Sequence, residues 1–159
     1  MDGFKSLISR RLRITSGPGA LSRLRRGLRE VLVLDLRRPE ARAMAMLAVE
    51  EAVANILEHG YGNRAGLPVE ITLRIGEGER FAVVLRDRAP VVDVTTLPPR
   101  DLDRLARDLA TRGRGLAMVR RIAESMRHRP RRGGGNELTL FFDAERLAGG
   151  AETLSGKAA

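Results

Sequence analysis

The chain has 159 residues, 43% of them hydrophobic, with no cysteine and a formal net charge of +9 at pH 7. That length suits one domain of about 100–200 residues, the lack of cysteine excludes disulfides and thiolate sites, and no apolar run approaches the roughly 20 residues of a membrane span. All basic residues except Lys5 and Lys157 are arginine, without the basic stripe on a docking motif that marks a nucleic-acid site. Because the N-terminus shows no secretory signal, we expect a cytoplasmic protein with no membrane or direct nucleic-acid contacts.

The first part of the chain predicts one strand and two helices. Residues 11–15 alternate like a strand, and a Gly-Pro-Gly run breaks the pattern. Leucine and valine recur at helical spacing over 21–32 with arginines on the other side, which indicates an amphipathic helix lying on a sheet. Pro39 suits the first turn of a long helix over 39–59, and Gly60 suits the left-handed residue after its end.

The second part predicts four more strands and one more helix. Residues 69–75 and 81–85 alternate around a glycine-rich turn. The stretch 88–112, rich in proline and charge, predicts a connection with at most one short helix. Beyond it we expect a helix over 113–126 and two strands, 127–132 and 137–142, joined by a triple-glycine turn.

The order of these elements predicts the fold class. Consecutive strands pair as hairpins, and the long helices are free to cover a single face. We therefore expect an α/β two-layer sandwich, in which helices cover one face of a mixed, largely antiparallel sheet. This domain would span residues 10–146, between an N-terminal extension over 1–9 and a small, polar, disordered tail over 147–159.

Glu51 and Asn55 lie four residues apart in the long expected helix, so they point to the same side of it. A carboxylate can accept a hydroxyl proton, and an amide oxygen can hold a hard cation such as Mg²⁺. The same pair could also be a glutamate at the helix edge and an asparagine bonded to the preceding turn. Spacing alone leaves both interpretations open.

Two other stretches carry polar chemistry. Asp87 follows a buried strand, where it could cap a turn or accept a hydrogen bond from an exocyclic amine such as that of adenine. The run Gly113, Arg114, Gly115, Leu116 would let backbone N–H groups at a helix start approach a phosphate, or would be an ordinary glycine-bearing loop. It has neither the third glycine of the dinucleotide-binding pattern nor the Lys-Ser or Lys-Thr of a P-loop.

The order of these pieces resembles the GHKL, or Bergerat-type, ATP-binding fold, and within it the bacterial anti-sigma-factor serine/threonine kinases. The resemblance spans residues 11–142. It is carried by the stretches "EEAVANILEHGYG", "RGRGLAMVRRIAESM" and "GGNELTL". In that family the helical Glu is the presumed general base and the Asn holds Mg²⁺, which implies these roles for Glu51 and Asn55.

The resemblance also implies roles along the rest of an ATP site. Asp87 matches the aspartate that recognises adenine, and His59 matches a histidine at the helix end. Gly113 to Leu116, with Arg114 between the glycines, match the backbone that faces the phosphates, and the segment at about 95–112 would close over the nucleotide as a lid.

Two positions depart from the family pattern. Asn136 stands where many GHKL proteins have a threonine that supports adenine binding, so we place it near the base. Ala89 stands where the family has a glycine. If that position needs positive φ or a close approach of adenine, its methyl group would cost about 1 kcal/mol or more.

Members of the family phosphorylate a serine or threonine of a small anti-anti-sigma protein. The unphosphorylated partner competes with a sigma factor or another effector for the kinase. The resemblance therefore implies a partner-switching kinase that uses ATP and Mg²⁺ and can form a homodimer. Three alternatives stay open: a binding switch of the same fold that transfers no phosphate, with or without nucleotide; a nucleotide-binding piece of a two-component histidine kinase; and a basic nucleic-acid binder.

Overall fold

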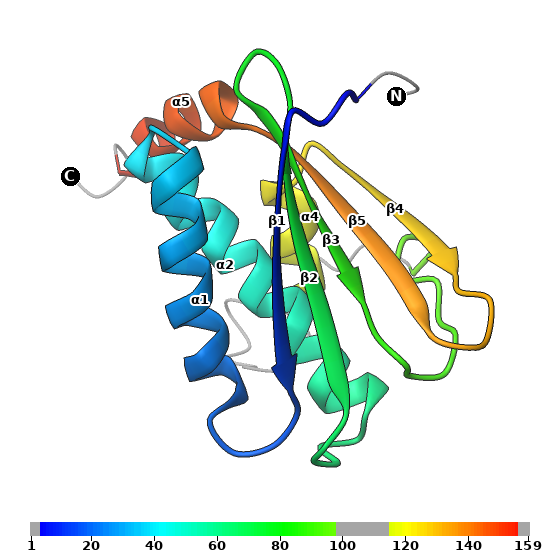
Figure 1. The fold of residues 1–159 in the computed structure, drawn as a ribbon. Coiled ribbons are helices and arrows are strands. Elements are labelled where there is room, and N and C mark those ends of the chain that lie inside the picture. Colours follow the sequence, from blue (N-terminus) through cyan, green and yellow to red (C-terminus); the bar gives the residue numbers. More distant parts are fainter. Residues whose placement is uncertain (1–3, 98–114, 156–159) are drawn as a thin grey trace.

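A computed structural model describes residues 4–97 and 115–155, which form a five-stranded sheet with helices on one of its faces (Figure 1). The strands are β1 (Ile8–Thr15), β2 (Pro68–Ile75), β3 (Arg80–Arg86), β4 (Ser125–Pro130) and β5 (Asn136–Asp143). They lie in the order β1-β2-β3-β5-β4, and every pairing is antiparallel. The expected α/β sandwich is confirmed, with a sheet that is antiparallel throughout rather than mixed.

The helical layer is built around one central helix. The helices are α1 (Ala20–Asp35), α2 (Pro39–Asn55), α4 (Gly115–Ile122) and α5 (Ala144–Ser155), and α2 continues into a π-helical turn, η1 (Ile56–Gly60). Helix α2 packs against α1, α4 and α5. Its alanines at 41, 45, 48 and 52 are all buried, and such small side chains let neighbouring helices approach α2 closely from several sides.

Helix α1 covers the edge of the sheet with one row of leucines. Leu24, Leu28 and Leu32 recur every four residues and are at most 2% exposed, and burial of each side chain contributes about 1.5–3 kcal/mol. Gly27 lies on the face toward β1, where a Cβ atom would come within 2.6 Å of a methyl carbon of Leu12. The glycine therefore lets β1 contact the helix backbone.

The boundary between α4 and β4 differs from the prediction. The helix expected over 113–126 ends at Ile122, and β4 already begins at Ser125, which pairs with Phe141. The backbone N–H of Glu124 donates to the carbonyl oxygen of Phe141 at 2.8 Å. Pairing with β5 therefore ends the helix four residues earlier than its apolar spacing indicates.

The two ends of the domain also differ from the prediction. Strand β1 begins at Ile8, inside the expected extension, because Ile8 pairs with Ile75 on β2. At the other end, the tail expected to be disordered from Leu147 is helix α5 through Ser155. Asp143 caps this helix, with Oδ1 accepting hydrogen bonds from the N–H groups of the two residues after Ala144, at 2.9 and 3.1 Å.

Gly60 does not have the left-handed conformation that the sequence suggested. The residues with positive φ after the helix are Gly62, at 58°, and Asn63, at 60°. The chain reaches them through η1, in which the N–H of Tyr61 donates to the carbonyl of Ile56 at 2.7 Å. This wide turn is a feature that often accompanies functional sites.

Candidate functional site

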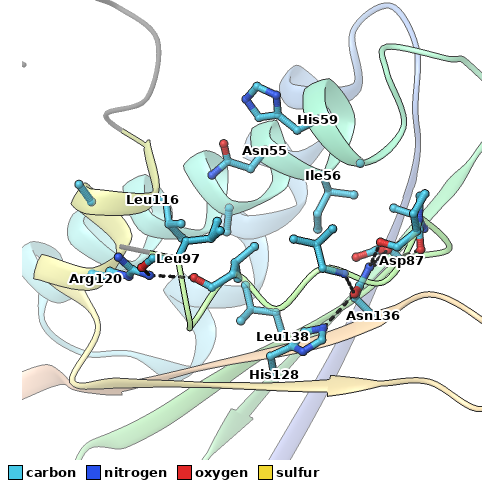
Figure 2. Close-up of a pocket in the computed structure, with 17 residues that line it drawn as sticks. Asn55, Ile56, His59, Asp87, Leu97, Leu116, Arg120, His128, Asn136 and Leu138 are labelled. Atoms are coloured by element: carbon cyan, nitrogen blue, oxygen red, sulfur yellow. Dashed lines mark hydrogen bonds between the residues drawn. The ribbon is translucent and has the colours of Figure 1, made fainter. Parts of the chain in front are cut away.

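A cavity of about 340 Å³ lies between the end of α2, the start of α4 and the β4–β5 edge of the sheet (Figure 2). The segment 87–97, which follows β3, forms another wall. Most of the lining is apolar, with Ile56, Val92, Val94, Leu97, Leu116 and Leu138 among its residues. This size, with few polar groups, is typical of a site for a small organic ligand.

Glu51 and Asn55 lie together beside the first residue of α4. A Cβ atom on Gly115 would come within 2.5 Å of Oε2 of Glu51 and 3.5 Å of Nδ2 of Asn55. Asn55 lines the cavity. Neither side chain makes a hydrogen bond or ion pair with the described part of the chain. The structure thus brings together the start of a helix with a carboxylate and an amide that have no partner among residues 4–97 and 115–155.

The glycine-rich run is only partly within the described residues. Gly113 and Arg114 lie outside them, as does most of the expected lid at 95–112. Leu116 lines the cavity next to Gly115. Of the run, the structure therefore places the part that opens α4, between Glu51 and the apolar wall of the cavity.

Asp87 lies at the opposite end of the cavity and is 3% exposed. Its Oδ1 accepts hydrogen bonds from the N–H of Ala89 at 2.7 Å and from Nδ2 of Asn136 at 2.9 Å. Its Oδ2 accepts none from the described residues. Within the described residues, one oxygen of this buried carboxylate is therefore bonded to the protein and the other is not.

The backbone around Asp87 is fixed from two sides. Gly135 has a φ of 94°, and a Cβ atom there would collide with the carbonyl oxygen of Asp87. On the other side, the hydroxyl of Tyr61 accepts a hydrogen bond from the N–H of Arg88 at 2.9 Å and donates one to the carbonyl of Pro68 at 2.5 Å. Burial raises the pKa of Tyr61.

Asn136 connects β5 to the segment after β3. Its Nδ2 donates to Asp87 and lies 3.2 Å from the carbonyl oxygen of Pro90. Its Oδ1 accepts from the N–H of Val92 at 3.1 Å and contacts Nε2 of His128 at 2.8 Å. These contacts place Asn136, which was expected near a bound base, directly beside Asp87.

Ala89 is 4% exposed and lines the cavity without positive φ. The backbone strain considered for an alanine at this position is therefore absent. Its methyl group lies against Gly60, where a Cβ atom would come within 2.8 Å of it. Gly60 thus provides the space that the extra methyl group at position 89 requires.

His59 is exposed at the rim of the cavity, on η1. It lies one turn beyond Asn55, and Figure 2 shows both side chains on the same side of the helix. It makes no hydrogen bond within the described ranges. The structure therefore brings it to the site, although less closely than Asn55.

Sequence reasoning missed two polar residues of the cavity wall. Arg120, on α4, donates to the carbonyl oxygens of Val94 and Leu97 at 2.9 and 2.5 Å, which ties this segment to the helix. His128, on β4, has a 4% exposed side chain and contacts Asn136. The helical spacing placed Arg120 on α4, but neither contact is local in the sequence.

Asp93 shapes the segment between these two residues. Hydrogen bonds from the hydroxyl and the N–H of Thr95 to Oδ1, at 2.5 and 2.9 Å, lower the pKa of Asp93. The same oxygen lies 3.7 Å from Nδ1 of His128. The carboxylate is 41% exposed, so water screens this contact strongly.

The sheet order, the helix carrying Glu51 and Asn55, and the cavity ending at Asp87 together define an ATPase-like domain. The histidine kinase-like ATPase domain family matches residues 14–142 of the chain. The chain belongs to this family, which confirms the GHKL fold inferred from the sequence. No curated protein sequence is detectably similar to the chain.

Two solved structures show which proteins share the fold. One contains the RsbU and RsbW domains of a Mycobacterium tuberculosis protein, with 19% identity and a TM-score of 0.58 over 85% of this chain and 32% of that one. The chain therefore spans about a third of that protein's length. The other is the SiaB–SiaC complex from Pseudomonas aeruginosa, with 14% identity and a TM-score of 0.61 over 86% of this chain and 89% of that one.

None of the helices within residues 4–97 and 115–155 combines the length and the apolar character that a bilayer crossing requires.

Proposed function

We propose that the chain is an ATP-dependent protein serine/threonine kinase that acts as a partner switch. It would phosphorylate a small anti-anti-sigma protein, and the unphosphorylated form of that partner would compete with a sigma factor or another effector for the kinase. The observation that carries the proposal is the Glu51 carboxylate, which lies next to Asn55 and the start of α4 and has no partner among the residues that the structure describes. At the other end of the same cavity, Asp87 keeps one carboxylate oxygen free of bonds to the described residues.

Each of these groups fits one part of a bound nucleotide. Oδ2 of Asp87 would accept a hydrogen bond from the amino group of adenine. The N–H groups that open α4 would face the phosphates. Glu51, next to them, would orient the incoming hydroxyl and accept its proton. Such a transfer depends mainly on positioning and on charge neutralisation.

Asn55 is suited to hold Mg²⁺, because its amide is unpaired in the described structure and lines the cavity beside Glu51. Magnesium needs few protein ligands and completes its shell with water and phosphate oxygens. A single asparagine is therefore a sufficient anchor. When bound, the ion would neutralise charge on the phosphates.

The two structural neighbours support a role in protein–protein recognition. One was solved as a complex of SiaB with SiaC, and the other contains an RsbW domain joined to an RsbU domain. A protein partner for this chain is the corresponding proposal. Because Glu51 must reach that partner's hydroxyl, the partner would dock over the end of α2 and the start of α4.

The test combines labelled ATP and Mg²⁺ with the anti-anti-sigma protein encoded nearest to the chain. We expect a labelled serine or threonine on that protein. Glu51→Gln should abolish the label but keep ATP binding, because the amide retains size and cannot accept the proton. The matched control is Glu50→Gln, one residue away on α2, where Glu50 pairs with Arg25 on α1. Equal labelling by Glu51→Gln and the wild type would refute the catalytic role.

A second candidate is a binding switch of the same fold that transfers no phosphate. Ala89 favours it, because its methyl group occupies space in the cavity that a glycine would leave open. This candidate predicts that the wild type binds the partner without labelling it. Labelled partner that disappears in Glu51→Gln would exclude it.

A further inference from the structure

A chain of buried polar side chains runs along the wall of the cavity from β4 to the end of β3. Nε2 of His128 lies 2.8 Å from Oδ1 of Asn136, and Nδ2 of Asn136 lies 2.9 Å from Oδ1 of Asp87 (Figure 2). Asp87 and Asn136 are 3% and 8% exposed, and the side chain of His128 is 4% exposed. The role of His128 is not explained by direct contact with a nucleotide base at Asp87, because Asn136 lies between the two residues.

The direction of every bond in this chain follows from its outer partners. The Asp87 carboxylate can only accept, so it faces the amino group of Asn136. The N–H of Val92 can only donate, so it faces Oδ1 of Asn136, at 3.1 Å. These two neighbours determine the orientation of the amide. Because Oδ1 can only accept, His128 must donate to it through Nε2–H.

Asn136 has no hydrogen-bonding capacity left for a ligand. Its amino group has two N–H donors, which face Asp87 and the carbonyl oxygen of Pro90. Its oxygen has two lone pairs, which face Val92 and His128. Asn136 therefore affects a ligand only indirectly, through the Asp87 carboxylate that it positions. Without His128 its oxygen would keep a single donor, the N–H of Val92, so the amide and the Asp87 carboxylate bonded to it would be held less tightly.

We propose that His128 is a positioning residue that, through Asn136, sets the base selectivity of the nucleotide site. It holds the carboxylate of Asp87 with Oδ1 bound to the protein and Oδ2 directed to a purine that carries an exocyclic amino group. The inference rests on the proposed function, since it requires a nucleotide base at Asp87. It assigns His128 a role at the base and none in phosphoryl transfer.

This role predicts that loss of His128 reduces the selectivity between two purine bases. Adenine presents an amino donor to the carboxylate, whereas the hypoxanthine of inosine triphosphate (ITP) presents a carbonyl acceptor at the same place and is repelled. A fixed carboxylate separates the two bases strongly, and a mobile one separates them less. Losing His128 should therefore lower the ratio of ATP to ITP affinity, while the rate of transfer at saturating ATP stays the same because Glu51 is unaffected.

The experiment measures the binding of ATP and ITP by calorimetry with Mg²⁺ present. His128→Leu should lower the ATP-to-ITP affinity ratio about tenfold, as expected for a loosened buried hydrogen bond. His128→Gln should restore most of it, since its amide nitrogen can donate where Nε2 does. Arg129→Ala is the matched control, because Arg129 is the next residue on β4 and is exposed. It should leave the ratio unchanged.

Nitrogen NMR of the imidazole rings provides a second readout, which tests the direction of the hydrogen bond between His128 and Asn136. The chain has two histidines, His59 and His128, so the His128→Gln variant assigns both. At a pH where the ring is neutral, His128 should carry its proton on Nε2. A neutral ring protonated on Nδ1 would overturn the inference, because it could not donate to Asn136.

An unchanged affinity ratio in His128→Leu would overturn the inference as well. If that variant does not fold, His128→Asn replaces it, because the shorter amide cannot reach Asn136, and it must show the same loss. The wild type separates this failure from that of the proposed function. If it binds neither nucleotide, both are wrong. If it binds ATP but the variants keep its selectivity, only the positioning role is refuted.

Discussion

Replacing Gly115 by alanine tests whether the start of α4 and Glu51 form one site. The added methyl carbon would lie 2.5 Å from Oε2 of Glu51, whereas an ordinary contact is about 3.5 Å. The carboxylate must therefore move by about 1 Å. A displacement of that size at a reacting group can lower a rate about 10²-fold, so phosphoryl transfer to the partner should fall by roughly this factor.

The same substitution should not destabilise the protein. The clash involves the flexible end of a glutamate, and alanine favours a helix over glycine by up to about 1 kcal/mol. The assay is therefore a comparison of labelled-phosphate transfer with thermal unfolding. Gly149→Ala on α5 is the control, because a Cβ atom there meets nothing within 4 Å. Wild-type transfer by Gly115→Ala would show that Glu51 does not act at this position.

Three further substitutions test the Asp87 end of the cavity. Gly135→Ala should lower both stability and ATP affinity, since its methyl group collides with the backbone of Asp87. Denaturant unfolding would measure the loss of stability, and calorimetry the loss of affinity. A stable variant with normal ATP affinity would contradict this prediction. Tyr61→Phe should lower the free energy of unfolding by about 2–3 kcal/mol, because it leaves two backbone groups unpaired. Burial raises the pKa of Tyr61, so its protonated form stabilises the wild type fully below about pH 10, and this contribution declines as pH rises further. Denaturation across that pH range should show no such decline from residue 61 in the phenylalanine variant. Tyrosinate absorbance reports the titration directly, because the chain has a single tyrosine. Ala89→Gly should tighten ATP binding by up to about fivefold. It should also lower the free energy of unfolding by about 1 kcal/mol, because a buried methyl group is lost next to Gly60. Weaker ATP binding would show that the methyl group does not restrict the base.

The sequence predicted the elements whose patterns are local. The leucine row of α1 and the alternation of β2, β3 and β5 place each residue on a face without reference to the rest of the chain. The end of α4 could not be predicted in this way. Val119, Ile122 and Met126 keep a helical spacing across the break, and only the pairing of Ser125 with Phe141 shows that a strand has begun.

The candidate site likewise combines residues that local spacing brings together with residues that only long-range pairing brings together. Glu51 and Asn55 share a helix face, so their spacing alone brings them together. Asn136 could be placed near the base only through family resemblance, because 49 residues separate it from Asp87. Its link to His128 is shorter in sequence, across 8 residues. It nevertheless requires the antiparallel register of β4 on β5, which the composition of these strands does not reveal.

Because η1 is a wide π-helical turn, the structure after it depends on the exact number of residues in this segment. A π-helical turn holds one residue more than an α-helical turn, so deleting a single residue from 56–60 would restore regular helix. Every later residue would then rotate by about 100° around the helix axis. Tyr61 would point away from Arg88, and the strand end that carries Asp87 would lose its anchor. Relatives with a one-residue gap at this place would therefore need another way to hold the aspartate.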